Sequence, residues 1–181
     1  MTDAAVEPQE HVAQLRAGRT VTVRAVRPDD RHAFAVAFER LSPHSRYTRY
    51  FRPLRELSPR MLDEVANPPA DCVMALAAFA DAPQQDGTER PIVGAARILW
   101  APGSHTCEFA VTIADDWQGA GLARHLIQTL ITLARARGMQ RMEGFVLPGN
   151  DGMRGLAHRL GFSDAPFPED PGLRLVSLDL K

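Results

Sequence analysis

Stretches of alternating or continuous apolar residues are separated along this chain by stretches with the apolar spacing of a helix. The alternating or continuous apolar stretches predict strands over residues 21–26, 72–80, 91–101, 105–114, 141–147 and 173–180. Start and stop signals predict helices that begin near Pro28, Pro43 and Pro59, and two more over about 122–137 and 151–160. This order of elements predicts an α+β fold in which a meander of strands leads into a β-α-β unit.

Three segments carry neither pattern. Residues 1–18 predict a flexible N-terminal tail, which leaves residues 19–181 as a single domain. The connector 81–90 is rich in Gln, Asp and Gly and predicts an exposed hairpin loop. Residues 163–172 contain three prolines and predict a surface loop.

Composition places the chain among ordinary globular proteins, with 45% hydrophobic and 24% charged residues. A formal net charge of −1 and the lack of a dense basic run argue against nucleic acid and anionic membranes as partners. No apolar stretch approaches the ~20 residues of a membrane helix. The polar, acidic start of the chain does not resemble a signal peptide, so we expect a cytoplasmic protein. We expect a monomer or a homodimer.

The numbers and positions of cysteine, histidine and lysine bear on disulfide formation, metal binding and acylation of the chain itself. Cys72 and Cys107 lie in apolar runs and predict buried thiols, and the six histidines lack the spacing of metal ligands, so we predict no metal. Lys181 is the only lysine among 21 basic residues, which we attribute to genomic composition. As a consequence, the chain offers very few ammonium groups of its own to an acylating reagent.

The segment Gln118-Gly119-Ala120-Gly121-Leu122-Ala123 is the most informative motif. It joins a predicted strand to a long amphipathic helix, where backbone N–H groups are unpaired and the helix dipole adds positive charge. Glycine lets the backbone approach an anion closely. The turn therefore suits a phosphate or pyrophosphate, although any tight strand-to-helix connection also uses glycine.

The context of this turn resembles the GNAT N-acetyltransferase superfamily. Gln118, Gly121 and Ala123 match its Gln/Arg-x-x-Gly-x-Gly/Ala signature, Asn150 follows, and Leu160-Gly161-Phe162 closes the next helix as in that family. Glu108-Phe109-Ala110-Val111 ahead of Asp116-Trp117-Gln118-Gly119 resembles bacterial Pat-like protein-lysine acetyltransferase domains. The resemblance implies a mixed, mostly antiparallel central sheet with helices on both faces.

The resemblance also implies acetyl-CoA, or another acyl-CoA, as cosubstrate. Backbone N–H groups of residues 118–124 (Gln118, Gly119, Ala120, Gly121, Leu122, Ala123 and Arg124) would hold its pyrophosphate. The pantetheine arm would lie along Val111, Thr112 and Ile113, with the N–H near Val111 on the thioester carbonyl. Asn150 would either contact the donor or cap the helix that follows it.

Glu108 is the predicted general base, because it is the only acid in an apolar strand and corresponds to the catalytic glutamate of Pat-like domains. An amine acceptor must lose a proton before it attacks a thioester, and a carboxylate can accept that proton. The alternative is a glutamate in an ion pair with Arg97. Ala157 stands where many relatives carry an acid tyrosine, so the general acid is unassigned.

The predicted function is acyl transfer from acetyl-CoA to a primary amine, either a protein lysine or a small molecule. Tyr47, Tyr50 and Phe51 with Arg46 and Arg49 could line the acceptor groove, or the aromatic residues could simply pack beneath an amphipathic helix. An acyl-CoA-binding sensor without turnover is a further alternative, which Ala157 favours and Glu108 opposes.

Overall fold

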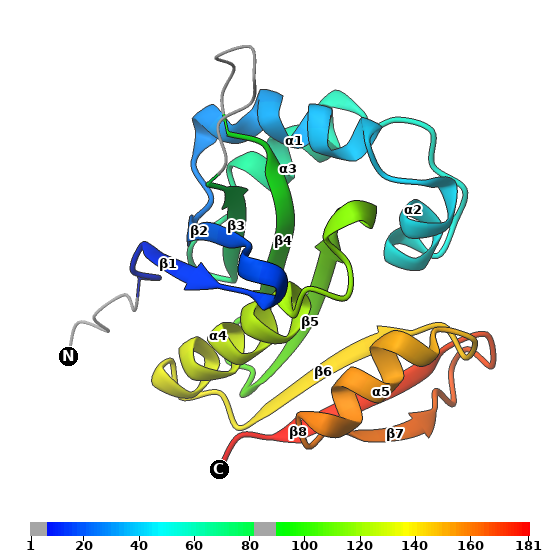
Figure 1. The fold of residues 1–181 in the computed structure, drawn as a ribbon. Coiled ribbons are helices and arrows are strands. Elements are labelled where there is room, and N and C mark those ends of the chain that lie inside the picture. Colours follow the sequence, from blue (N-terminus) through cyan, green and yellow to red (C-terminus); the bar gives the residue numbers. More distant parts are fainter. Residues whose placement is uncertain (1–6, 82–89) are drawn as a thin grey trace.

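The computed structural model describes residues 7–81 and 90–181, and its core is one eight-stranded sheet with the order β1-β2-β3-β4-β5-β6-β8-β7 (Figure 1). Only β5 and β6 pair in parallel, so the predicted mixed, mostly antiparallel sheet is confirmed. The strands are β1 His11–Gln14, β2 Thr20–Ala25, β3 Val73–Ala80, β4 Ile92–Leu99, β5 Thr106–Ile113, β6 Arg141–Val146, β7 Ser163–Pro166 and β8 Arg174–Asp179.

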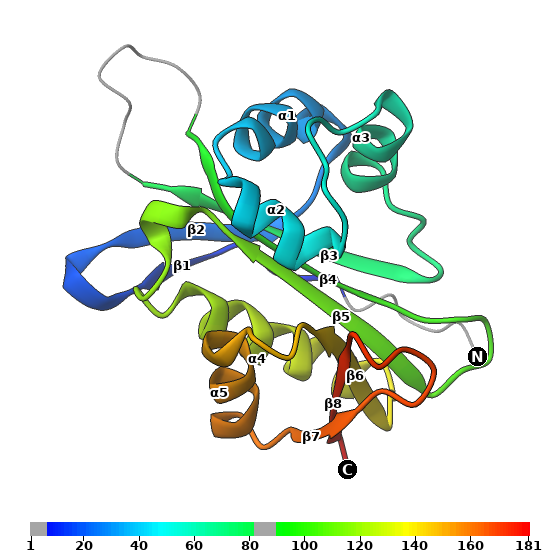
Figure 2. The same ribbon diagram turned by 90° about the vertical axis from the view of Figure 1, so that its right-hand side faces the viewer.

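Helices cover both faces of the sheet, as predicted (Figure 2). One face carries α1 Arg31–Glu39, α2 Pro43–Tyr50 and α3 Pro59–Ala66, and the other carries α4 Leu122–Ala136 and α5 Asp151–Arg159. Ser42 and Ser58 cap α2 and α3 through their side-chain oxygens, and a proline follows each cap. No helix in the described part of the chain is both long and apolar enough to cross a bilayer.

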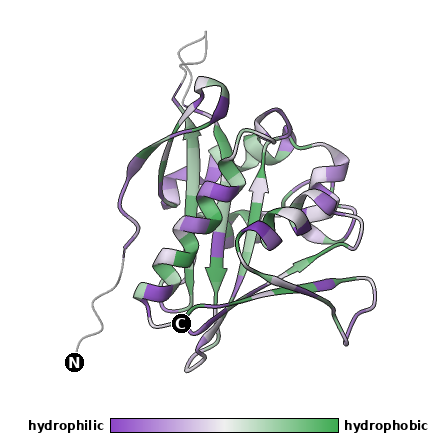
Figure 3. Cartoon of the chain, turned by 60° about the horizontal axis from the view of Figure 1, so that its bottom comes forward, coloured by the Kyte–Doolittle hydropathy of each residue, from purple (hydrophilic) through white to green (hydrophobic). Residues whose placement is uncertain are grey.

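The main core lies between α4 and the sheet. Leu122, Leu126, Ile127 and Leu130 of α4 are fully buried, and each contributes roughly 1.5–3 kcal/mol through burial. Apolar positions gather where helices and strands meet (Figure 3). Gly94 of β4 lets α4 lie close to the sheet, since a Cβ there would come within 2.8 Å of Leu122 Cδ2.

β5 and β6 separate after only three paired positions, the last of which joins Glu108 to Glu143. Immediately beyond this pair, the ring of Phe109 occupies the space where a side chain on Gly144 would stand: a Cβ there would lie 2.4 Å from Phe109 Cε1. The ring also packs against Phe162, with centroids 5.3 Å apart. Phe109 thus fills the start of the gap between the two strands.

Two strands occur where the sequence predicted irregular chain. His11–Gln14, within the predicted tail, form β1 because their backbone pairs with the edge of β2 and Ala13 is buried. Ser163–Pro166, within the predicted loop, form β7 on the edge of β8, and Asp164 accepts hydrogen bonds there from Arg154 and Arg174. Both strands are four residues long, too short for a periodic signal. Most of the predicted 81–90 hairpin loop lies outside the described residues.

The end of β2 is joined to α1 by a buried ion pair. Both Oδ atoms of Asp30 accept from the Arg24 guanidinium, at 2.7 and 2.8 Å, and Oδ2 also accepts from the Arg27 N–H at 2.7 Å. Burial raises the pKa of Asp30, but the hydrogen bonds from Arg24 and Arg27 outweigh it, so the pKa lies below its usual value.

We predict that Asp30→Ala lowers the free energy of unfolding by roughly 3 kcal/mol, because it leaves the half-buried Arg24 without its anion. Asp29→Ala, at the exposed neighbouring position, is the matched control, with an expected change below about 0.5 kcal/mol. Urea denaturation measures both. Because the pKa is lowered on folding, the difference should persist above the ordinary aspartate pKa and shrink as pH falls through the lowered one. Equal stability of the two variants would contradict this role of the ion pair.

Candidate active site

The separation of β5 and β6 leaves a cleft of about 470 Å³, which we call the donor cleft. It is bordered by β5, by α2 on one side and by the starts of α4 and α5 on the other. The sequence-predicted site residues that line it are Glu108, Val111, Thr112, Ile113, Gln118, Gly119, Gly121, Leu122, Ala123, Arg124 and Asn150. Ala120 does not line it: its side chain is buried, and its carbonyl accepts from the Arg16 N–H at 3.0 Å.

The glycine turn presents unpaired backbone donors to this cleft. No hydrogen bond within the described residues uses the N–H groups of residues 119–124, and the first α4 bond is from His125 N–H to the Gly121 carbonyl, at 3.1 Å. Gly119 and Gly121 adopt φ values of 76° and 93°, which glycine tolerates best. The space beside both is open, with no atom within 4 Å of where a Cβ would stand. The turn therefore offers an anion a row of donors at the positive end of a helix.

The edge of β5 facing the gap is also unpaired. Ala114 N–H donates to the Val93 carbonyl on the β4 side at 2.9 Å. N–H directions alternate along a strand, and Val111 is three residues before Ala114. The N–H of Val111 therefore points to the other side of β5, toward the gap where β6 is no longer paired. The side chain of Val111 packs against the core cluster at the same time. The backbone of β5 can thus hydrogen-bond a ligand while its side chains stay packed.

Glu108 lies at the point where the strands separate, and its side chain makes neither a hydrogen bond nor an ion pair within 4.0 Å to any described residue. The alternative of a direct Arg97 ion pair is therefore not what the structure has. Burial raises the pKa of Glu108; the charges of Arg97 and Arg49 lower it, and that of Glu143 raises it, so the pKa stays above its usual value.

Asp115 ties the two sides of the cleft together. Its carboxylate accepts from Ser42 N–H and Oγ at 2.9 and 2.7 Å and from Ser45 Oγ at 2.8 Å. Ser45 Oγ in turn accepts from Gln118 Nε2 at 3.2 Å. Burial raises the pKa of Asp115, but the hydrogen bonds from Ser42 and Ser45 outweigh this effect, so the pKa lies below its usual value. The start of α2 is thereby held against the turn that precedes α4.

The α5 side holds no acid at the expected position. Asn150 caps α5, since its Oδ1 accepts from Met153 N–H at 3.1 Å, and it also lines the donor cleft. Ala157 is 1% exposed and belongs to the core, whereas His158 is exposed. Neither residue borders the cleft.

Sequence reasoning missed two of the cations at the cleft. Arg16, from the segment after β1, and Arg159, from the end of α5, line it together with Arg124. Their distance in sequence from the glycine turn concealed them, and only the pairing of β1 with β2 brings Arg16 there. Three guanidinium groups around unpaired N–H groups favour a ligand with several phosphates.

The residues expected at the acceptor groove divide between two roles. Arg49 and Phe51 line the donor cleft. Arg46 is structural, since it donates to the Arg55 and Glu39 carbonyls at 2.7 and 2.9 Å. Tyr50 packs edge-on against Phe38, and Tyr47 is 43% exposed. Neither tyrosine of α2 lines the donor cleft, although Tyr50 borders a second cavity on the same side of the sheet.

Comparison with known proteins agrees with this geometry. The model of the acetyltransferase (GNAT) family matches residues 28–162. Acetyltransferase PA5475 of Pseudomonas aeruginosa is 37% identical over 167 residues, which cover 92% of this chain and 88% of that protein. The crystal structure of the GNAT domain of S. lividans PAT superposes with a TM-score of 0.83 at 25% identity, covering 94% of this chain and 96% of that one. YncA of Salmonella typhimurium, solved with its cofactor acetyl-CoA, gives a TM-score of 0.67 at 20% identity, covering 89% and 94%.

The family match covers most of the chain, and the similarity to PA5475 extends over nearly its whole length. The sheet opens between β5 and β6 beside residues 111–113, where the resemblance places the pantetheine arm, and the glycine turn joins β5 to α4 as the signature requires. The chain therefore belongs to the acetyltransferase (GNAT) family, whose members are acyl-CoA-dependent N-acyltransferases.

Proposed function

We propose that this protein transfers an acetyl group from acetyl-CoA to a primary amine, by direct attack with Glu108 as general base. The observation that carries the proposal is the unpaired carboxylate of Glu108 beside the unpaired backbone edge of β5. A base without an internal partner is free to accept a proton from a bound amine.

The donor cleft fits an acyl-CoA. The N–H groups of residues 119–124 suit the pyrophosphate, whereas that of Gln118, also predicted to bind it, donates to the Asp115 carbonyl at 3.4 Å. Arg16, Arg124 and Arg159 supply cations for the remaining phosphate. The pantetheine arm, which carries amide groups, would pair with the open edge of β5 along residues 111–113. Asn150 lines the same cleft, and its amide nitrogen is available to the donor while its Oδ1 caps α5.

The reaction exchanges one bond at the acyl carbon. The amine nitrogen gives a proton to Glu108 and attacks the carbonyl carbon of the thioester. A C–N bond forms and the C–S bond breaks, with the bonding electrons leaving on the thiolate. The nitrogen loses its second proton as the amide forms, and the thiolate takes up this proton through water. The N–H of Val111 would stabilise the negative charge that develops on the carbonyl oxygen. Water is the proposed source of the final proton, since Ala157 supplies none.

Two other functions are tested by the same assay. The acceptor can be a protein lysine or a small-molecule amine, and both require acceptor-dependent thiol release. A sensor would bind acyl-CoA without turnover.

We place the catalytic domain in residues 19–181, preceded by a segment that contributes β1 and Arg16.

We predict that Glu108→Gln reduces kcat/KM about 10²–10⁴-fold while leaving acyl-CoA binding intact, because it removes the proton acceptor and keeps the shape. The measurement is thiol release from acetyl-CoA with a panel of amines, including lysine-bearing peptides, together with calorimetric CoA binding. Glu143→Gln, on the residue paired with Glu108 in β6, is the matched control and should keep most turnover. Full activity of Glu108→Gln would remove Glu108 from the mechanism, and binding without turnover by the wild type would favour the sensor.

The raised pKa of Glu108 predicts a pH dependence. The base must be ionised, so the acidic limb of kcat/KM due to this group should lie above the ordinary glutamate value of 4.5. A pH profile of the wild type identifies the limb, and the residual activity of Glu108→Gln should lack it. A limb retained in the variant would belong to the titrating amine instead.

We predict that Gly144→Ala weakens CoA binding and lowers stability by roughly 1–3 kcal/mol, because the new methyl group would overlap the buried ring of Phe109 and shift β5 against β6. Calorimetry and thermal denaturation measure the two effects. Gly149→Ala is the control, since no atom lies within 4 Å of its added Cβ. If both variants bind CoA as the wild type does, the packing at Gly144 does not set the cleft.

A further inference from the structure

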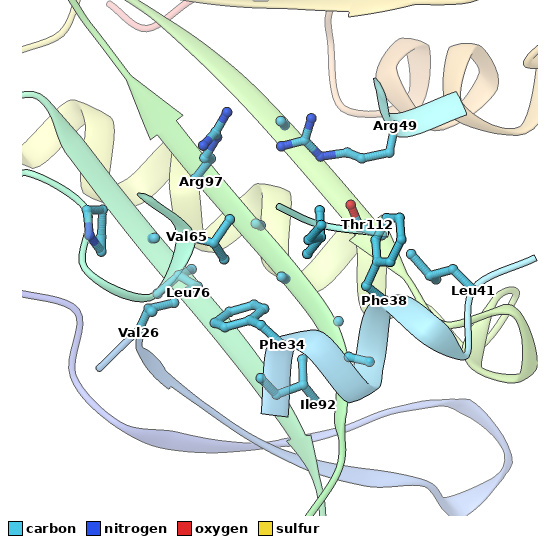
Figure 4. A pocket seen from close by; sticks show the side chains of 18 of the residues that line it. Val26, Phe34, Phe38, Leu41, Arg49, Val65, Leu76, Ile92, Arg97 and Thr112 are labelled. Atoms are coloured by element: carbon cyan, nitrogen blue, oxygen red, sulfur yellow. The ribbon is translucent and has the colours of Figure 1, made fainter. Parts of the chain in front are cut away.

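A second, smaller cavity lies on the opposite face of β4 and β5 from α4. It encloses about 100 Å³ between α1, α3 and the strands, and we call it the apolar pocket. Its walls are mostly apolar, with Val26, Phe34, Leu76 and Ile92 among them, and Arg49 and Arg97 stand together at one end (Figure 4). An apolar cavity of about 150 Å³ binds benzene, so this one has room for a smaller aliphatic group.

The two arginines at its end are in direct contact with no anion of the described chain, although Glu108 is close enough for its charge to act on both. Neither side chain makes a hydrogen bond or an ion pair with any residue of the described chain, and Arg97 Nε is buried without a partner. Figure 4 shows Arg49 extending from α2 across β5 toward Arg97 of β4. Burial lowers the pKa of Arg49 and the charge of Arg97 lowers it further, and the charges of Tyr50 and Glu108 offset this only in part. The Arg49 guanidinium also lies 5.0 Å from the centroid of the Tyr50 ring. Glu64 also borders the pocket, but its carboxylate is paired with Arg60 at 2.8 Å.

Two half-buried cations facing each other are unfavourable unless an anion joins them. A carboxylate suits the planar guanidinium groups best, since each can donate two hydrogen bonds to it. The arginine pair therefore points to a ligand with a carboxylate, or an oxyanion of the same geometry.

This pair lies close to the proposed base. Arg97 is paired with Ala110 in the β4–β5 ladder, so its side chain is on the same face of the sheet as those of Ala110 and Glu108. Arg49, Ala110 and Thr112 border both the donor cleft and the apolar pocket, which places the pocket next to the reacting centre.

We propose that the acceptor is a small amino acid-like molecule, whose carboxylate binds between Arg49 and Arg97, whose amine faces Glu108 and whose apolar side chain enters the apolar pocket. A lysine side chain of a protein has no carboxylate beside its ammonium group and would leave the arginine pair unsatisfied. This inference rests on the acyl-transfer function proposed above, and it assigns Arg49 and Arg97 to acceptor specificity.

The test compares matched acceptors in the thiol-release assay: L-leucine, L-leucinamide, which lacks the carboxylate, and a short peptide with one internal lysine. We expect kcat/KM for L-leucine to exceed that for L-leucinamide at least tenfold. Arg97→Gln and Arg49→Gln should each raise KM for L-leucine about 100-fold with kcat changed far less, and so remove the preference for the acid over the amide. Arg52→Gln, an exposed arginine just after α2, is the control and should change neither constant.

Binding of L-leucine, measured by calorimetry in the presence of CoA, separates this proposal from the one on which it rests. Binding that Arg97→Gln weakens, without thiol release, would support the arginine site and refute the transferase. Turnover with the lysine peptide that exceeds turnover with L-leucine, or equal use of L-leucine and L-leucinamide, would overturn the arginine site and leave the transferase standing. Arg97→Lys, which keeps the charge, should restore part of the affinity, and a thermal melt of each variant shows that it is folded.

Discussion

The contact between the ring of Phe109 and the backbone at Gly144 lies at the point where the sheet opens. Parallel strands normally continue pairing for as long as both remain extended, yet β5 and β6 pair at only three positions. The ring takes the place of a side chain on Gly144 and packs against Phe162 behind it. Beyond this contact the backbone of β5 has no paired strand on one side, and the donor cleft lies along this unpaired edge, with Glu108 at its start.

Two structural elements are held beside this opening: the glycine turn before α4 and the helix α2. The tight packing of α4 on Gly94 sets where the helix starts, and hence where the glycine turn presents its N–H groups. Asp115 binds the start of α2 to the same turn, so the helix that carries Arg49 is held in relation to the donor cleft.

How far the sequence predicts this structure depends on the range of the signal. The glycine turn, the strand with Glu108 and the helix starts near Pro43 and Pro59 are local patterns, and the architecture they imply is confirmed. β1 and β7 escaped prediction because their stability comes from pairing with β2 and β8. Arg16 escaped for the same reason. Arg49 was named for the acceptor groove, but its position beside Arg97 was not predicted, because elements far apart in sequence bring these cations to their cavities. The roles of the individual site residues remain predictions.

The position of Lys181 has a practical consequence for experiments on this protein. It is the only lysine in the sequence and is exposed just after β8, while its neighbour Leu180 is buried. Amine-directed labelling of the side chains can therefore modify one site only, outside both cavities. A fluorophore or a surface tether attached through this amine would have a uniform orientation, and an antibody against acetyl-lysine would detect little background from the enzyme itself.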